Sequence, residues 1–210
     1  PLSSPKAAPQ LPPAAMLPVP RSEGMKVEPV TERYPNGNIK VERQVILDAA
    51  GNYINQGTYT MHDPDGKVLK TGEFQNGKQE GKWVQNLAKD EGQLFSAEQQ
   101  KEFASPFVSE ATFVDGKLQG PWTIKDRDGK KIIEWNFENG VRHGNWTWWH
   151  SNGQKWLEAT SRNGSLNGEL MEWDRDGKIV SQSAYIDGRV LAKVVGWHAL
   201  GQKHYEGAYL

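Results

Sequence analysis

The residues of this chain best suited to chemistry or recognition are nine tryptophans and a recurring set of glutamates. Tryptophan combines a large apolar ring with one N–H donor, so it serves in a core, at a protein interface or against a sugar ring. Carboxylates bind a cation or act as acid and base when two of them lie close together. Because both residue types recur at intervals, their chemistry depends on which face of which element each set occupies.

The glutamates belong to a row placed five residues after a series of turn signals. This row contains Glu42, Thr71, Glu134, Glu158, Gln182 and Glu206. Stacked hairpins would separate its members by two strand spacings, about 10 Å, which is too far for a shared cation or a retaining glycosidase pair. Lysines recur just after the turns, so cross-strand ion pairing is the better interpretation. With no cysteine and no metal-ligand, phosphate or dinucleotide motif, the sequence predicts no catalytic, cofactor-binding or metal-binding residue.

The large aromatic residues fall into two further rows. One row is uniformly apolar, which predicts the buried side of a sheet: Tyr59, Trp83, Trp122, Trp146, Leu170 and Val194. The other row lies three positions further on, where strand parity predicts the opposite face unless a bulge intervenes: His62, Lys125, Trp149, Trp173 and Trp197. Rings on this second face either cover their own hairpin turns or form an exposed contact patch. A contact patch would be centred on Trp148, Trp149, Trp173 and Trp197.

Regularly spaced glycines indicate the elements that position these rows. The predicted turn glycines recur in steps of 11 and 13 residues, giving a 24-residue period, and are Gly66, Gly77, Gly116, Gly129, Gly140, Gly153, Gly164, Gly177, Gly188 and Gly201. Asn or Asp precedes most of them, which is typical of tight hairpins. The runs between them are short and rich in aromatic and β-branched residues. The pattern predicts an all-β fold, an elongated single antiparallel meander sheet of repeated hairpins.

A second glycine follows four residues after alternate turn glycines, and each opens the next strand. These glycines are Gly81, Gly120, Gly144 and Gly168. A glycine at the start of a strand indicates a β-bulge or a close backbone approach. We therefore expect an irregularity where each hairpin joins the sheet.

Two segments depart from this rhythm. Residues 1–31 are rich in Pro and Ala and predict a flexible, partly polyproline-II tether, or simply a disordered terminus, before a repeat domain at 32–210.

Residues 84–112 replace one turn with an insertion, in which Ser96–Gln99 resembles a capping box and Pro106 would end a short helix. We expect this loop and helix to cover one sheet face through Leu94, Phe95, Phe103 and Phe107. A long insertion in a repeat array is also a common place for specific binding.

The net charge and hydropathy of the chain limit the cellular locations and the classes of binding partner that we expect. The net charge is -1, and no apolar run approaches a bilayer span, so neither nucleic acid nor direct membrane insertion is indicated. Membrane association would come through an anchor preceding Pro1. We expect a bacterial envelope, periplasmic or secreted protein, with the cytoplasm as the alternative. The C-terminal strand, 203–210, is the expected free edge for a homodimer.

The unit at residues 139–155, Asn-Gly-x-x-x-Gly-x-Trp-x-x-Trp-x-x-Asn-Gly-Gln-Lys, resembles the MORN-repeat variant family, named for membrane occupation and recognition nexus. Many bacterial members are labelled YwqK-family antitoxins. The resemblance covers roughly residues 32–210, although the opening copies fit poorly. It implies an elongated sheet, a role in protein contacts or membrane-associated scaffolding, and, from the label, neutralisation of a toxin partner.

Two functional hypotheses follow from these patterns. The first is a non-enzymatic binding or scaffolding module, with toxin neutralisation as one specific form. The second is an envelope carbohydrate-binding protein or glycan-acting enzyme that stacks sugars on the tryptophan rows, with Glu134 or Glu158 as acids. A deep pocket holding two carboxylates would favour the second hypothesis, and a flat sheet would count against it.

Overall fold

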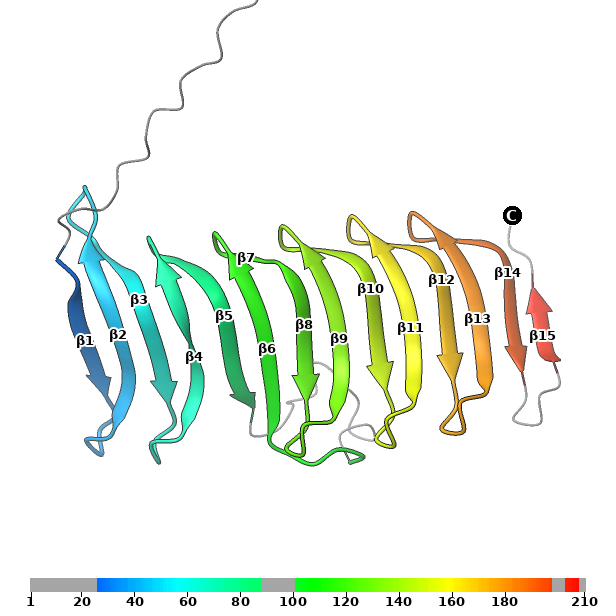
Figure 1. Cartoon of the computed structure of the whole chain (residues 1–210), viewed down its shortest axis with the longest axis horizontal. Coiled ribbons are helices and arrows are strands. Elements are labelled where there is room, and N and C mark those ends of the chain that lie inside the picture. Colours follow the sequence, from blue (N-terminus) through cyan, green and yellow to red (C-terminus); the bar gives the residue numbers. More distant parts are fainter. Residues whose placement is uncertain (1–25, 88–100, 198–202, 208–210) are drawn as a thin grey trace, which may run out of the picture.

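The computed structural model describes residues 26–87, 101–197 and 203–207, with side chains up to residue 191. These residues form one antiparallel sheet whose strands lie side by side in chain order, from β1 at one edge to β15 at the other (Figure 1). The strands are β1 (Glu28–Arg33), β2 (Ile39–Leu47), β3 (Tyr53–His62), β4 (Val68–Gln75), β5 (Lys78–Leu87), β6 (Phe107–Val114), β7 (Lys117–Leu118), β8 (Gly120–Lys125), β9 (Lys131–Glu138), β10 (Val141–Trp149), β11 (Lys155–Arg162), β12 (Ser165–Trp173), β13 (Ile179–Ile186), β14 (Arg189–Trp197) and β15 (Lys203–Gly207). The short β7 pairs with β6 beside the main path. The predicted all-β single sheet of hairpins is confirmed, and it begins at Glu28, within the segment expected to be a tether.

At one long edge of the sheet, the β2–β3 loop is closed by hydrogen bonds from the Ala50 and Asn52 N–H groups to the Asp48 carboxylate, and the connections from β4 onward contain two-residue turns. Each is an Asn-Gly or Asp-Gly pair in which both residues have positive φ; in Asn139-Gly140, for example, φ is 52° and 83°. This backbone follows the right-handed twist of the strands, and Asn, Asp and Gly tolerate it best. Each turn is also bonded to the preceding hairpin, as Gly140 N–H donates to Leu118 O and Gly164 N–H donates to Arg142 O. The same backbone hydrogen bond between successive hairpins therefore recurs with the 24-residue period of the sequence.

The other long edge carries longer loops with a different internal lock. In the Asp-x-Asp-Gly-Lys loops, the carboxylate of Asp63, Asp126 or Asp174 accepts hydrogen bonds from the backbone N–H groups two and four residues later. Only the glycine of each loop needs positive φ, which is 85° at Gly66 and 81° at Gly129. The alternation of 11- and 13-residue steps therefore reflects two turn types on opposite edges. All predicted turn glycines except Gly201, which lies outside the described residues, have positive φ.

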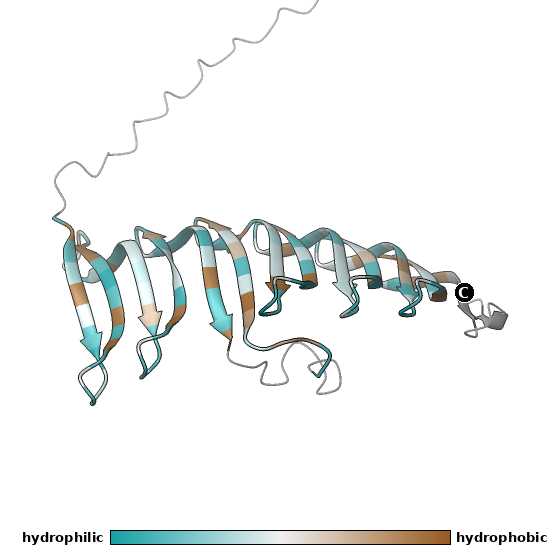
Figure 2. Cartoon of the chain, turned by 60° about the horizontal axis from the view of Figure 1, so that its bottom comes forward, coloured by the Kyte–Doolittle hydropathy of each residue, from teal (hydrophilic) through white to brown (hydrophobic). Residues whose placement is uncertain are grey.

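The second glycines introduce the expected bulges. Gly81, Gly120, Gly144 and Gly168 have φ between 66° and 117°. Strand pairing shifts register near them, for example between Arg142 and Trp146 where β10 pairs with β9. A bulge in each hairpin bends the strand and increases its twist, which agrees with the pronounced twist of the sheet in Figure 2.

The insertion differs from the prediction in extent and in structure. Strands β5 and β6 pair in continuous register up to Leu87 and Phe107, so the excursion spans 88–106 instead of 84–112. No helix occurs in the described chain, and 101–106 form turns and bends; Ser96–Gln99 lie outside those residues, as do Leu94 and Phe95. The helix prediction is therefore wrong for 101–105. Tertiary contacts explain the difference, because Ala104 O accepts from Arg127 N–H and Phe103 packs on the sheet, so neither is available for a helical turn.

A small core lies where the insertion meets the sheet. Phe107, Ile124, Ile132 and Ile133 are each at most 2% exposed. Leu87, Phe103 and three tryptophans pack around them, so the prediction that Phe103 and Phe107 cover apolar surface is confirmed. Glu102, in the same segment as Phe103, forms an ion pair with Arg175, which lies in the loop between β12 and β13. Within the described ranges, no helix could span a membrane.

Candidate binding surface

The sheet has two chemically different faces. We call the face of Tyr59, Trp83 and Trp122 the aromatic face, and the face of Glu110, Glu134 and Glu158 the charged face. Strand register assigns the residues: Trp122, Trp135 and Trp146 are direct partners on one face, while Thr123, Glu134 and Thr147 are partners on the other. In Figure 2 apolar and polar residues alternate along several strands, as a sheet with two unlike faces requires.

The aromatic face carries two groups of contacting rings. In the first group Trp83 lies 5.0 Å from Phe74, 5.8 Å from Tyr59 and 6.4 Å from Phe113, measured between ring centroids. In the second group Trp135 contacts Trp122, Trp146 and Trp148, and Trp148 contacts Trp156. The predicted apolar row lies on this face from Tyr59 to Leu170, and the side chain of Val194 lies outside the described residues. Trp83 is only 3% exposed, but most other rings are half-buried because a single sheet provides no second layer.

The four tryptophans predicted to form one contact patch do not share a face. Trp148 packs against Trp135 and Trp156 on the aromatic face. Trp149 and Trp173 lie on the charged face, as the row pattern predicted, and the side chain of Trp197 lies outside the described residues. Consecutive residues of a strand point to opposite faces. The grouping of Trp148 with its neighbour is therefore wrong, although the binding role of the individual residues stays a prediction.

Each tryptophan of the charged face is associated with a lysine–glutamate pair. Lys131 Nζ lies 5.5 Å from the ring centroid of Trp149 and 2.5 Å from a Glu134 carboxylate oxygen. Lys155 repeats this arrangement with Trp173, 6.0 Å away, and Glu158. Thr147 of β10 pairs with Glu134 of β9 on one side and with Glu158 of β11 on the other, so the two glutamates are two strand spacings apart. The glutamate row therefore pairs with lysines at these two positions, but each pair lies within one strand, so the prediction that these pairs would cross between strands is wrong here.

The charged face also holds a carboxylate with a shifted pKa. Glu110 lies between Lys125, at 2.9 Å, and Lys82, at 3.2 Å. The hydrogen bond from Lys125, assisted by Lys82, lowers the pKa of Glu110 despite some opposing burial. This acid is therefore held ionised as a structural ion pair, and it is not suited to donate a proton near neutral pH.

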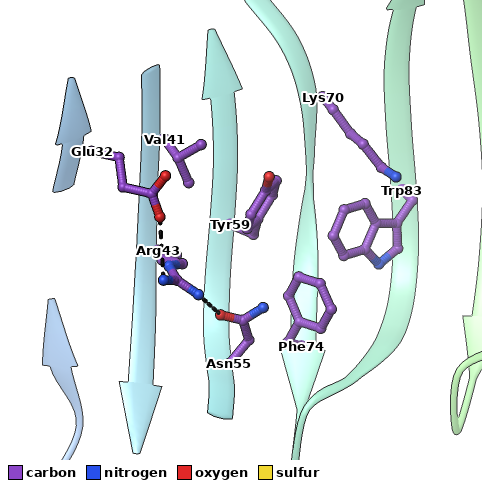
Figure 3. Close-up of a pocket in the computed structure, with 8 residues that line it drawn as sticks. All are labelled: Glu32, Val41, Arg43, Asn55, Tyr59, Lys70, Phe74 and Trp83. Atoms are coloured by element: carbon purple, nitrogen blue, oxygen red, sulfur yellow. Dashed lines mark hydrogen bonds and ion pairs between the residues drawn. The ribbon is translucent and has the colours of Figure 1, made fainter. Parts of the chain in front are cut away.

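A hollow of about 310 Å³ lies on the aromatic face over β1 to β5 (Figure 3). Its aromatic wall is formed by Tyr59, Phe74 and Trp83, and Val41 adds an apolar contact. The hollow also contains Glu32, Arg43, Asn55 and Lys70. Lys70 Nζ lies 5.0 Å from the ring centroid of Trp83, so one cation already stands over the wall.

Arg43 is the central polar residue of the hollow. Its Nη1 donates to Asn55 Oδ1 at 3.0 Å, and its Nη2 lies 3.2 Å from a Glu32 carboxylate oxygen. Its Nε is buried and has no hydrogen-bond partner in the described chain. A buried donor without a partner is costly and rare. Nε itself is closed off from solvent, but the Arg43 side chain is 32% exposed, and each Nη keeps a second N–H that is not engaged beside the aromatic wall.

Neither Arg43 nor Asn55 was predicted from the sequence to be a site residue. One signal for Arg43 was present: in Val41-x-Arg43-x-Val45 the cation occupies the apolar positions of an alternating strand. The space around it has no such signal. Gly72, opposite Tyr59 in the register, contributes to it by making room for the Trp83 ring of the wall, because a Cβ there would lie 2.3 Å from that ring.

Two hairpins of the sheet match a known family. The family model for the MORN repeat variant matches residues 55–76 and 142–163. The first match covers most of β3 and β4, including Tyr59 and Phe74 of the hollow, and the second covers most of β10 and β11. No curated protein is similar enough to match the chain. Hairpins β3–β4 and β10–β11 are thus similar to the MORN repeat variant, whose repeats are generally associated with protein or membrane binding.

Proposed function

We propose that this chain is a non-enzymatic module that binds a protein partner through the hollow of the aromatic face. The observation that carries the proposal is the combination of an aromatic wall, in which Tyr59 and Phe74 are half-buried, with unengaged N–H donors on Arg43. Aromatic and arginine side chains are the most common hot spots of protein interfaces. The similarity of β3–β4 to a repeat associated with protein or membrane binding supports the same conclusion.

The hollow suits an extended polypeptide segment. It is open to solvent, it runs across neighbouring strands, and its aromatic rings stand beside polar groups (Figure 3). A bound segment would bury apolar side chains against Tyr59 and Phe74 while its polar backbone met Arg43 and Asn55. Binding of this kind needs no catalytic group and no cofactor.

Toxin neutralisation is the specific form of this function that the family resemblance suggests. In that form the partner is a toxin segment held in the hollow, and the chain acts in the bacterial envelope, tethered through residues 1–31. The carbohydrate alternative is weaker, because Lys131 and Lys155 already stand over the rings of Trp149 and Trp173 and engage Glu134 and Glu158. Stacking of a sugar on either ring would have to displace that lysine.

We expect two copies of the chain to associate through the edge strands of the sheet and not through the hollow. Among the described strands, β1 and β15 each have one neighbour, so within that part of the chain their outer sides present unpaired backbone groups. Pairing of such edges between two copies would leave the hollow accessible. Sedimentation of the full chain over a range of concentrations tests the homodimer separately from partner binding.

Photo-crosslinking in the source cells tests the proposed function. Tyr59 is replaced by p-benzoylphenylalanine in one chain, and Trp173 is replaced in a matched chain that carries the probe on the charged face. We expect one protein to be crosslinked from position 59 and not from position 173. Adducts from position 173 alone, or no adduct from a folded chain probed at 59, would refute the hollow as the binding site.

A further inference from the structure

Most of the free polar atoms of the hollow are hydrogen-bond donors. Arg43 Nε is buried and unpartnered. Asn55 uses its Oδ1 to accept from Arg43, which leaves its Nδ2 directed elsewhere, and neither Nδ2 nor Lys70 Nζ donates a hydrogen bond to a described residue. One oxygen of the Glu32 carboxylate is paired with Arg43, which leaves its second oxygen and the Tyr59 hydroxyl as the main acceptors. The hollow therefore offers donors to a ligand and few acceptors.

This donor-rich character selects among polypeptide ligands. An ordinary extended segment brings one N–H per residue, and each buried N–H needs an acceptor. A proline-rich segment brings carbonyl acceptors and apolar rings but lacks the N–H at every proline. Such segments bind aromatic-lined grooves in their preformed polyproline-II conformation. Tyr59, Phe74 and Trp83 provide an aromatic wall of that kind.

The chain carries a segment of this chemistry in the sequence before β1. Seven of its twelve prolines fall within residues 1–25, and five of these lie at positions 9–20. The segment leads directly into β1, whose Glu32 lines the hollow. Position 20 lies eight residues before Glu28, a distance of about 25 Å in polyproline II at about 3.1 Å per residue. The hollow extends over β1 to β5, four strand spacings or about 19 Å.

We propose that residues 9–20 bind in the hollow of their own chain, with proline rings against the aromatic wall and backbone carbonyls accepting from Arg43 and Asn55. Covalent attachment gives the segment a high effective concentration at this site. The bound segment competes with the partner for the hollow, so it regulates the same site. In that respect the inference rests on the proposed function.

Paramagnetic broadening tests this contact in the full chain. The chain has no cysteine, so Ala7→Cys provides a single attachment point for a nitroxide. The reporter is the indole N–H signal of Trp83 in the hollow wall, and the internal control is that of Trp173 on the charged face. The same labelled chain carrying Pro12→Ser and Pro13→Ser gives the baseline for a tether of equal length, and these two substitutions lie outside the sheet.

We expect the Trp83 signal to lose intensity in the labelled chain and to regain it in the Pro12→Ser/Pro13→Ser chain, while the Trp173 signal stays constant. Equal broadening with and without the prolines would overturn the proposal. Broadening found only when labelled and isotope-enriched chains are mixed would assign the segment to a second copy and overturn the contact within one chain. A chain that crosslinks a partner from position 59 but shows no proline-dependent broadening would keep the proposed function and lose this inference.

Discussion

The aromatic and charged faces use tryptophan for different purposes. On the aromatic face Trp83 is 3% exposed and contacts three other rings. On the charged face Trp149 and Trp173 have a lysine over the ring and a lysine–glutamate pair beside it. The same residue type therefore supplies the core on one face and a half-buried cover on the other. In a sheet without a second layer, the face that concentrates its rings takes the role of the interior.

The largest difference between the faces is expected at Trp83. Trp83→Ala removes the centre of a four-ring cluster that cannot collapse, so it should lower the free energy of unfolding by about 3–5 kcal/mol. Urea denaturation monitored by circular dichroism gives this value. Trp149→Ala, measured in the same way, is the matched control on the charged face. Equal losses from the two substitutions would remove the distinction between the faces.

Gly72 sharpens the comparison, because it lies directly beneath the Trp83 ring. A Cβ at this position would stand 2.3 Å from Trp83 Cδ2. We expect Gly72→Ala to destabilise the chain by about 1–3 kcal/mol through overpacking. Combining it with Trp83→Leu should reduce the effect of Gly72→Ala, because the clash is shared. Simple additivity of the two substitutions in urea denaturation would show that the ring does not lie on this glycine.

On the charged face a single tryptophan should matter less. Trp149→Ala removes a half-buried ring and its contact with Lys131, and we expect a loss of about 1 kcal/mol. The matching substitution Trp173→Ala should cost a similar amount, because Lys155 and Glu158 repeat the arrangement. Chemical denaturation of both variants measures the two losses. A loss at either position as large as that of Trp83→Ala would mean that this face also contains a core.

The smallest effect is expected at Glu110 and depends on pH. The ion pairs lower its folded pKa below the ordinary value of 4.5, so their stabilisation is present above that pH and is lost as the pH falls through the folded pKa. Near neutral pH, Glu110→Gln should cost about 0.5–1 kcal/mol. Below pH 4.5 the gap from the wild type should close. The loss caused by Trp83→Ala should not change over this range, and a gap for Glu110→Gln that widened in acid would contradict the assignment.

Much of the fold could be predicted because its signals are local. Asn139-Gly140 and the other pairs fix two-residue turns, and Gly144 and its equivalents fix the bulges. Their 24-residue spacing then determines the order of the strands. Alternation along strands correctly placed Trp83 and Trp122 on one face and Trp149 on the other. These predictions required only strand parity and backbone preference.

The predictions that depended on contacts between distant segments were less successful. A capping-box pattern at Ser96–Gln99 suggested a helix extending toward Pro106, but Phe103 and Ala104 are used by the sheet. Trp148 was grouped with Trp149 as a sequence neighbour although parity separates them. The hollow was missed because it forms between side chains of five neighbouring strands, β1 to β5, and no local sequence pattern predicts such a space.

The most direct test of the difference between the faces is the affinity of a partner captured through position 59. Binding is measured by isothermal titration calorimetry for the wild type, for Arg43→Gln/Lys70→Gln, and for Trp149→Ala/Trp173→Ala. Loss of hot-spot contacts in the hollow should weaken binding by at least about tenfold, or 1.4 kcal/mol, in the Arg43→Gln/Lys70→Gln chain. The charged-face chain should bind like the wild type. The reverse order, with the chains folded by circular dichroism, would place the binding surface on the charged face and contradict the proposed function.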